Sequence, residues 1–300
     1  MKQQERYEER RRNVWQYAMI DPDYYDSLEN YKARDDLVRH VIPFLPKDWR
    51  IRQRGIWQQI IPRNRTQRMQ GWKIHVSAHI SNRESILKIV TRRCIEHEVF
   101  FKFSCDGWMH HLMNTRRWPR SGSGKFITIY PPSDDAFKQL IEHLYLELKD
   151  FEGPYILSDK RYKNCKVLYY RYGAMMGVDQ IEYDGRRTPF IISPTGDMVP
   201  DLRMPFFNPP SWVQDPFPEE MDEDPDPILG SGRYVITQSI TFSNSGGVYL
   251  AYDTETGQEV IIKEARPHTD CLPDGSDAFA HRKREWKRLK ELQDTGLTPV

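Results

Sequence analysis

The sequence predicts an α+β protein built on a twisted, mostly antiparallel sheet with flanking helices. Short apolar segments of strand character occur at residues 71–78, 99–105, 125–130 and 166–172. Helical patterns and hairpin-like turns separate these segments without a regular βαβ repeat. This order favours an α+β arrangement over a parallel α/β sheet.

The predicted helices follow from apolar spacing and end signals. Residues 133–149 give the clearest helix, because Ser133 is a good N-cap, two aspartates follow it and the apolar positions form one face. A second helix is predicted at 81–98 from a similar apolar stripe. Shorter helices are expected at 4–18 and at 32–41, the latter ending before Pro43 because proline cannot continue a helix.

The second part of the chain has a different composition. Residues 189–227 are rich in proline and acids and lack periodicity, which is typical of a solvated, semi-extended linker. Strand patterns return at 234–240 and continue to a charged helix at about 277–292. We therefore predict a first domain over 1–215, an acidic, proline-rich linker over 216–230 and a second domain over 231–300.

Composition limits the classes of protein that fit. The chain has 300 residues, of which 38% are hydrophobic and 29% charged, and no run of 18 apolar residues occurs, so no membrane partner is expected. The N-terminus lacks the apolar region of a secretory signal. The four cysteines form no CxxC pair, which predicts a reducing, cytoplasmic location and no metal site.

Charge is segregated along the chain although the net charge is only +1. Residues 47–73 contain eight basic residues and one acid, and a second basic cluster covers 116–125. Residues 215–226 contain seven acids and no base. Basic clusters predict an anionic ligand, and the lack of a nucleic-acid-binding motif argues against nucleic acid as that ligand.

Polar residues at the ends of the predicted strands form a candidate site. Lys73 and His75 lie two apart in one strand and therefore point to the same face, opposite Trp72 and Ile74. The full set also includes Lys102, Arg120, Tyr130, Asp159 and Arg171. With one carboxylate among so many cations, such a site expects an external anion, and paired arginines suit a phosphate.

Lys102 has a distinct place in this set. It lies in an apolar strand, where desolvation and a second lysine would lower its pKa and allow it to act as a base. The residues alone leave open that these are unrelated surface charges.

The segments GWKIHVSA, FFKFS, GKFITIYP, SD and YRYG, in this order and spacing, resemble the N-terminal lyase domain of class III and related class IV lanthipeptide synthetases. That domain is similar to the bacterial phosphothreonine lyases. The resemblance implies a phosphothreonine-lyase-like fold and a phosphorylated lanthipeptide precursor as the partner. The implied reaction is β-elimination of phosphate from phosphoserine or phosphothreonine, leaving dehydroalanine or dehydrobutyrine, without metal or organic cofactor.

The resemblance also implies roles for individual residues. Lys102 would be the base, His75 the general acid, and Lys73 would stabilise the enolate or phosphate and lower the pKa of Lys102. Arg120 and Arg171 would hold the phosphate, Tyr130 would support Lys102 and Asp159 would orient His75. A further basic group near the end of the domain has no clear match: Arg186 and Arg187 are candidates, with a solvated turn after Gly185 as the alternative.

The second half resembles the start of a protein kinase. TFSNSGGVYLA is similar to a degenerate glycine-rich loop that keeps Gly246 and Gly247, VIIKEA to a strand carrying the nucleotide lysine Lys263, and REWKRLKEL to a helix with its partner Glu285. ATP or another NTP with Mg²⁺ would bind only in the full-length kinase. No HRD or DFG motif precedes Val300, so kinase activity is not expected from this chain.

Two further interpretations remain open. The same cationic pocket could belong to a non-catalytic module that binds a phosphopeptide or a leader peptide. Nucleic-acid binding through residues 47–73 is the weaker interpretation, and a steep loss of binding with salt would mark it.

Overall fold

The computed structural model describes residues 23, 26–34, 36–64, 67–176, 179–181, 187–204, 206–218, 228–229, 232–272 and 274–296. The chain divides into two compact units, which are described separately. The first comprises Met1–Met113 and Pro119–Asp222, and the second comprises Asn114–Trp118 and Glu223–Val300. The helix predicted at 4–18 lies outside the described residues.

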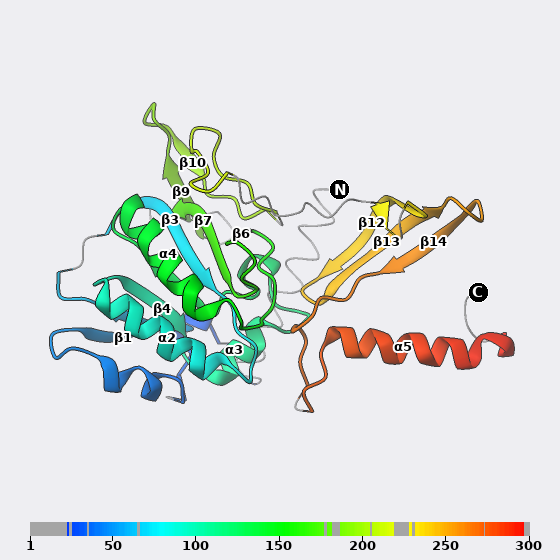
Figure 1. The fold of residues 1–300 in the computed structure, drawn as a ribbon, viewed down its shortest axis with the longest axis horizontal. Helices are drawn as coiled ribbons and strands as arrows, with labels where there is room; N and C mark the ends of the chain where they lie inside the picture. The colour runs from blue at the N-terminus through cyan, green and yellow to red at the C-terminus, as the bar shows by residue number, and fades with distance from the viewer. Residues whose placement is uncertain are drawn as a thin grey trace. The chain divides into compact units, whose positions relative to one another are not determined.

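The first unit is built on a seven-stranded sheet in the order β1-β2-β4-β5-β3-β7-β6 (Figure 1). Its strands are β1 (Arg50–Arg54), β2 (Trp57–Ile61), β3 (Gln70–Val76), β4 (Phe100–Ser104), β5 (Ile127–Tyr130), β6 (Lys160–Arg161) and β7 (Leu168–Ala174). All neighbouring strands are antiparallel. The predicted α+β class with a mostly antiparallel sheet is confirmed.

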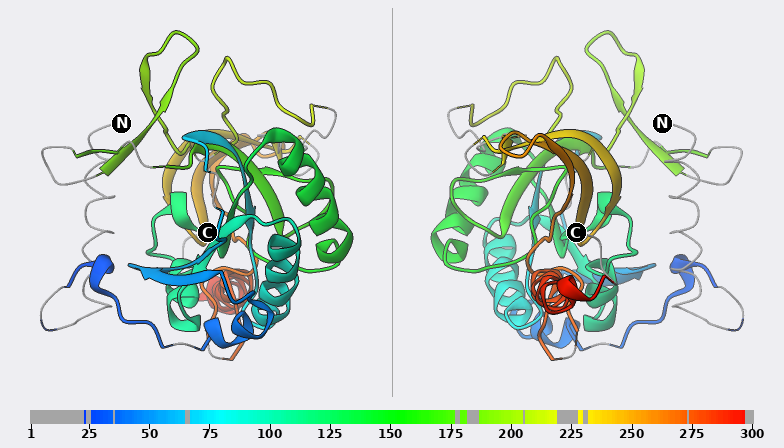
Figure 2. Two further views of the ribbon diagram at one scale, coloured as in Figure 1. Left: turned by 90° about the vertical axis from the view of Figure 1, so that its left-hand side faces the viewer. Right: turned by 90° about the vertical axis from the view of Figure 1, so that its right-hand side faces the viewer.

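Two helices, α2 (Arg83–Glu96) and α4 (Asp134–Leu148), lie side by side on one face of this sheet (Figures 1 and 2). Ser133 caps α4 as predicted, its hydroxyl accepting from the Ala136 N–H at 3.1 Å. The Trp72 ring packs against Phe137 of α4 with a centroid separation of 6.0 Å. Because neighbouring residues of β3 alternate between faces, Lys73 and His75 point away from the helices.

The segment before the sheet differs from its prediction. The prediction of a single helix at 32–41 is wrong. The chain instead forms three short 3₁₀ turns, η1 (Leu28–Asn30), η2 (Val38–His40) and η3 (Ile42–Phe44). Pro43 lies inside η3, at a first-turn position where a missing N–H costs no hydrogen bond.

The unpredicted helix α3 (Gly107–Met113) follows β4. The Asp106 carboxylate caps its start by accepting from the Met109 N–H at 2.7 Å. A further turn, η4 (Arg120–Gly122), precedes β5.

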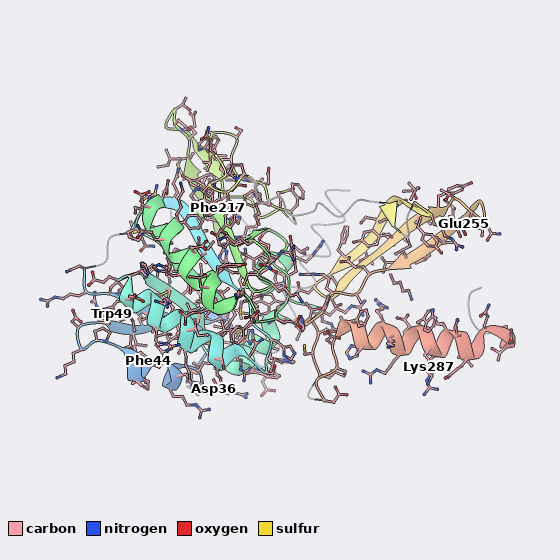
Figure 3. The ribbon with its side chains drawn as sticks, in the orientation of Figure 1. Asp36, Phe44, Trp49, Phe217, Glu255 and Lys287 are labelled. Atoms are coloured by element: carbon pink, nitrogen blue, oxygen red, sulfur yellow. The ribbon has the colours of Figure 1, made fainter. Side chains whose placement is uncertain are left out.

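The proline-rich stretch is also more ordered than predicted. Strands β8 (Asp179–Ile181), β9 (Arg187–Ile192) and β10 (Met198–Pro200) form a small sheet in the order β10-β9-β8. Phe217, labelled in Figure 3, lies 4.8 Å from Tyr162 and 5.9 Å from Phe137 between ring centroids. The linker interpretation is therefore wrong for residues 189–204 and 206–218, because aromatic residues between the prolines pack on the first unit's core.

The second unit contains a four-stranded antiparallel sheet, β11-β12-β13-β14, and one long helix. Its elements are β11 (Ile228–Leu229), β12 (Tyr234–Ser243), β13 (Gly246–Asp253), β14 (Gln258–Lys263), α5 (Ala278–Leu292) and η5 (Gln293–Thr295). Asp277 caps α5 by accepting from the Ala280 N–H at 3.0 Å.

Gly246 opens β13 with a φ of 141°, and a Cβ there would lie 2.1 Å from the Glu264 carbonyl oxygen. The close approach of the two backbones therefore requires glycine.

The four cysteines are buried and free. None of the helices within the described ranges has the length and apolar character needed to cross a membrane.

Candidate functional site

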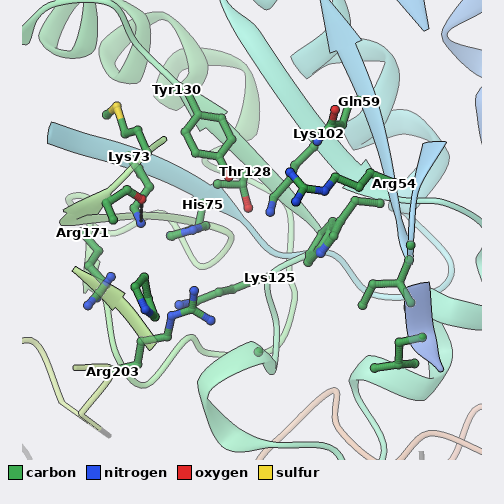
Figure 4. A pocket seen from close by; sticks show the side chains of 18 of the residues that line it. Arg54, Gln59, Lys73, His75, Lys102, Lys125, Thr128, Tyr130, Arg171 and Arg203 are labelled. Atoms are coloured by element: carbon green, nitrogen blue, oxygen red, sulfur yellow. Dashed lines mark hydrogen bonds between the residues drawn. The ribbon is translucent and has the colours of Figure 1, made fainter. Parts of the chain in front are cut away.

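A pocket of about 500 Å³ lies on the sheet face opposite α2 and α4 (Figure 4). Its lining comes from β1 to β5, from β7 and β9, from the turns η1 and η4 and from the loops beside them. The polar and aromatic lining residues are Glu29, Arg54, Trp57, Gln59, Lys73, His75, Lys102, Lys125, Thr128, Tyr130, Arg171 and Arg203. Glu29 is the one carboxylate among the described lining residues, so the pocket is strongly cationic.

Five of the seven residues predicted for the site line this pocket: Lys73, His75, Lys102, Tyr130 and Arg171. Strand register explains their meeting. Lys73 pairs with Arg171 across β3 and β7, while Thr128 pairs with both His75 and Lys102. Residues directly opposite each other in a sheet point to the same face, so these groups from β3, β4, β5 and β7 project together.

Asp159 lies directly behind His75, outside the pocket lining. Its Oδ2 is hydrogen-bonded to His75 Nδ1, and its Oδ1 lies 3.2 Å from Lys125 Nζ and accepts from Ser158 Oγ at 2.7 Å. Burial opposes ionisation of this carboxyl, but His75 and Lys125 hold its pKa well below the usual range. Asp159 therefore occupies Nδ1 and leaves Nε2 as the ring nitrogen available to a ligand.

The pKa of His75 is lowered to about 3 by burial, against the opposing charge and hydrogen bond of Asp159. Nearby Lys125 and Lys73 act on this pKa in the same direction as burial. The imidazole is therefore neutral at pH 7 in the surroundings that the chain itself provides. A ligand of negative charge would raise this pKa by favouring the imidazolium.

A second carboxylate, Asp201, neutralises the cations at the other end of β3. It forms a hydrogen-bonded ion pair with Arg171, lies 4.0 Å from Lys73 Nζ and accepts from the Ala174 N–H at 3.0 Å. Lys73 Nζ donates to the Ala174 carbonyl oxygen at 3.0 Å. Burial, with Arg171, Arg203 and Lys125 nearby, still lowers the pKa of Lys73 well below its ordinary value.

Lys102 has no such partner among the described residues. Its Nζ lies 4.3 Å from the centroid of the Trp57 ring, and Figure 4 shows Arg54 on the same side of the pocket. Burial, together with the charges of Arg203 and Arg54, lowers the pKa of Lys102 to about 7. The expected contribution of Lys73 is not among these causes. At pH 7, a large fraction of Lys102 is neutral and able to accept a proton.

Lys125 is the pocket cation closest to Asp159. Burial lowers its pKa to about 8, while Asp159 acts in the opposite direction. Its Nζ also lies 2.9 Å from Ser158 Oγ. Lys125 is therefore largely protonated at pH 7 and can hold an anion there.

Arg120 differs from its prediction. It is not one of the described residues that line the pocket, because η4 places Gly122 at the lining instead. Arg203 and Lys125 are the additional cations that face the cavity. Arg186 lies outside the described residues, as does the side chain of Arg187.

Sequence reasoning missed Arg54, Lys125, Asp201 and Arg203. Lys125 stood in a basic cluster that we noted without assigning it to the site. Arg54 lies on the edge strand β1, and Asp201 and Arg203 lie in the irregular proline-rich stretch after β10. The positions of all three depend on strand pairing, which the periodicity of the sequence does not reveal.

The second unit brings Lys263 and Glu285 together. Lys263 at the end of β14 forms an ion pair with Glu285 of α5, with Nζ and Oε1 2.7 Å apart. Hydrogen bonds from Lys263 and Arg282 lower the pKa of Glu285. Gly246 and Gly247 open β13 directly after the turn from β12.

The first unit is thus an α+β domain whose antiparallel sheet carries a cationic pocket, with lysines of lowered pKa and a buried His–Asp pair. Residues 38–226 match the family model described as RamC, N-terminal domain. The chain belongs to this family, and the predicted relation to a lanthipeptide synthetase is confirmed.

One curated relative is the probable SapB synthase of Streptomyces coelicolor, which is 37% identical over 289 residues. The match covers 94% of this chain and 31% of that protein, so the chain spans about a third of the relative's length.

Two solved structures resemble part of the chain. One is the type III effector and phosphothreonine lyase OspF from Shigella flexneri, with a TM-score of 0.35, 16% identity and coverage of 54% of this chain and 89% of that one. The other is the VirA (SpvC) phosphothreonine lyase effector of Chromobacterium violaceum, with a TM-score of 0.35, 18% identity and coverage of 48% and 74%. Similarities this distant assign no function.

Proposed function

We propose that this chain eliminates phosphate from phosphoserine or phosphothreonine residues of a lanthipeptide precursor. The observation that carries the proposal is Lys102, a lysine with a pKa of about 7 and no carboxylate partner among the described residues, in a pocket lined by five further cations. A phosphate ester supplies the negative charge that this pocket lacks. Membership of the RamC N-terminal domain family supports the assignment to lanthipeptide biosynthesis.

The proposed reaction needs a base and charge stabilisation at one carbon. Neutral Lys102 Nζ removes the proton from the substrate Cα, and the electron pair of that bond forms the Cα=Cβ double bond. The Cβ–O bond breaks, and its electron pair leaves with the phosphate. Negative charge that develops on the substrate carbonyl oxygen is stabilised by Lys73.

His75 is the proposed proton donor to the leaving phosphate oxygen. Its Nε2 is the free ring nitrogen because Nδ1 is bonded to Asp159. A bound phosphate and Asp159 together would favour the imidazolium, offsetting the burial that lowers the pKa of His75. Asp159 thus acts as a positioning residue behind the acid.

The phosphate itself would be held by Arg171, Arg203 and Lys125, with Lys73 beside them. Arg171 is fixed by Asp201, whereas Arg203 has no hydrogen bond or ion pair to any described residue. We propose Arg203 and Lys125 in place of Arg120, which does not line the pocket.

The test compares wild type with Lys102→Ala on a phosphoserine peptide, and mass spectrometry follows the loss of phosphoric acid. Wild type should eliminate phosphate, and Lys102→Ala should do so about 10²- to 10⁴-fold more slowly because the base is gone. Lys88→Ala on α2, exposed on the opposite side of the sheet, is the matched control and should match wild type.

Undiminished elimination by Lys102→Ala would contradict the assignment. Tight binding of the phosphopeptide by wild type without any elimination would favour a non-catalytic binding module instead.

For the second unit, we propose the beginning of a kinase N-lobe, supported by the Lys263–Glu285 ion pair at 2.7 Å. In the full-length enzyme, Lys263 would contact the phosphates of ATP or another NTP, and Glu285 would orient it. Nucleotide with Mg²⁺ supplies the phosphoryl group when bound. In the full-length enzyme, Lys263→Met should weaken nucleotide binding in a fluorescence titration, whereas unchanged binding would contradict this role.

A further inference from the structure

The edge strand β1 carries three arginines on one face. Arg50, Arg52 and Arg54 alternate with Ile51 and Gln53, so their side chains point the same way. Register identifies that face. Arg52 lies opposite Gln59, and Gln59 lies opposite Lys102. Because Gln59, Lys102 and Arg54 all line the pocket, Arg50 and Arg52 project from the pocket face of the sheet.

These arginines are available to a ligand. Arg50 and Arg52 are exposed, and neither forms a hydrogen bond or ion pair with any residue that the structure describes. Within the described ranges, β1 pairs with β2 only and is the edge of the sheet. Arg50 and Arg52 belong to the basic cluster at 47–73. Of that cluster, only Lys73 has a role in the proposed reaction.

Edge strands often carry charge to prevent pairing with other chains. That general role does not require all the charges to lie on one face. In β1, the face away from the pocket carries Ile51, which is 39% exposed, and Gln53. The positive charge is thus confined to the side on which the pocket opens.

We propose that Arg50 and Arg52 form a docking surface for negatively charged side chains that flank the reacting residue in the same substrate peptide. This inference rests on the proposed function. The path from Lys102 to Arg52 crosses two strand spacings, or about 10 Å. An extended peptide advances about 3.3 Å per residue. The favoured acidic residue therefore lies about three residues from the reacting phosphoserine.

The test uses two phosphoserine peptides of equal length. One has Asp at positions two to four residues from the phosphoserine on both sides, and the other has Asn at those positions. The measured quantity is the ratio of kcat/KM for the Asp peptide to kcat/KM for the Asn peptide. Arg50→Gln/Arg52→Gln should lower this ratio about two- to thirtyfold, since each of the two exposed ion pairs contributes about 0.2–1 kcal/mol. Added salt should lower the wild-type ratio as well.

Lys88→Gln/Lys138→Gln makes the same change in charge at exposed positions of α2 and α4, on the other face of the sheet. Its ratio should equal that of wild type. An equal ratio in wild type and Arg50→Gln/Arg52→Gln would overturn the docking proposal, as would an equal fall in the control.

Binding separates this inference from the proposed reaction. If wild type eliminates phosphate from neither peptide, the proposed function fails, and fluorescence anisotropy of a labelled Asp peptide decides the docking surface. Weaker binding by Arg50→Gln/Arg52→Gln supports it, and unchanged binding overturns it. Tighter binding of a labelled single-stranded DNA than of the Asp peptide, lost in the same variant, would overturn the peptide as occupant.

Discussion

The two sides of the pocket differ in how their cations are neutralised. On one side, Lys125 lies 3.2 Å from Asp159, and Arg171 and Lys73 share Asp201. On the other side, Lys102 and Arg54 have no carboxylate partner among the described residues (Figure 4). A cation paired with a carboxylate is held in place, whereas Lys102, with none, is left to meet the substrate. This difference suits Lys102 to proton transfer and suits the paired cations to holding the substrate in a fixed position.

Among these predictions, removal of the Asp159 charge on the paired side should have the largest effect on stability. Asp159→Asn leaves Lys125 and His75 without the buried carboxylate, which should reduce the free energy of unfolding by about 3 kcal/mol and kcat by about 10²-fold. Denaturant unfolding and elimination kinetics measure the two effects. Ser158→Ala removes one hydrogen bond to the same carboxylate but keeps its charge, so its cost should be about 1 kcal/mol.

The pH dependence of this loss has a defined sign. The pKa of Asp159 is held below its usual value in the folded protein, so its stabilisation is present above the unfolded pKa and is lost as pH falls through the folded pKa. The stability difference between wild type and Asp159→Asn should therefore be full at pH 7 and shrink only in acid. A constant difference down to acid pH would contradict the ion-pair explanation.

Removing the unpaired charge should stabilise the fold. Lys102→Met replaces a buried ammonium with an apolar side chain of similar size and should raise the free energy of unfolding at pH 6 by about 2 kcal/mol. The pKa of Lys102 is about 7 in the folded protein and about 10.4 in the unfolded chain, so the wild type becomes more stable as pH rises between these values. The stabilisation produced by Lys102→Met should therefore become smaller towards pH 10. Lys88→Met, at an exposed position, should stay within about 0.5 kcal/mol of wild type. Destabilisation by Lys102→Met would show that the lysine is held by a favourable interaction instead.

The smallest expected effect concerns Arg203. Its charge lowers the pKa of Lys102, so Arg203→Gln should raise that pKa and move the rising limb of the pH profile for kcat/KM to higher pH. The ratio of the rate at pH 6.5 to the rate at pH 8 should fall about threefold relative to wild type. A uniform loss at all pH values would mean that Arg203 only binds phosphate. Lys138→Gln serves as the control for a distant loss of one charge.

The strands and helices with strong periodicity could be predicted from the sequence. Alternation along β3 correctly separated Lys73 and His75 from Trp72, and the apolar strand β4 indicated a desolvated Lys102. Asp159 entered the candidate set as a polar residue near a predicted strand, but its role beside His75 came only from the resemblance, because no pattern connects it with a strand far away in the sequence. Its contact with His75 depends on the tertiary fold.

The missed residues share a physical reason. Asp201 and Arg203 follow β10 in a stretch whose prolines and acids indicated a linker. In the structure, Asp201 pairs with Arg171 and Arg203 lines the pocket. Arg54 enters because β1 pairs with β2 at a particular register, which a single sequence does not specify. Arg120 was assigned as a polar residue near the end of a predicted strand, and it is not among the described residues that line the pocket.

The most direct test of the central claim is a titration of Lys102 itself. The protein can be labelled with trace acetic anhydride at a series of pH values, and peptide mass spectrometry can follow the fraction of Lys102 acetylated against exposed Lys88 as the internal reference. An unpaired, buried Lys102 should react with a midpoint near pH 7. A midpoint near 10, equal to that of an ordinary lysine, would contradict its role as the base.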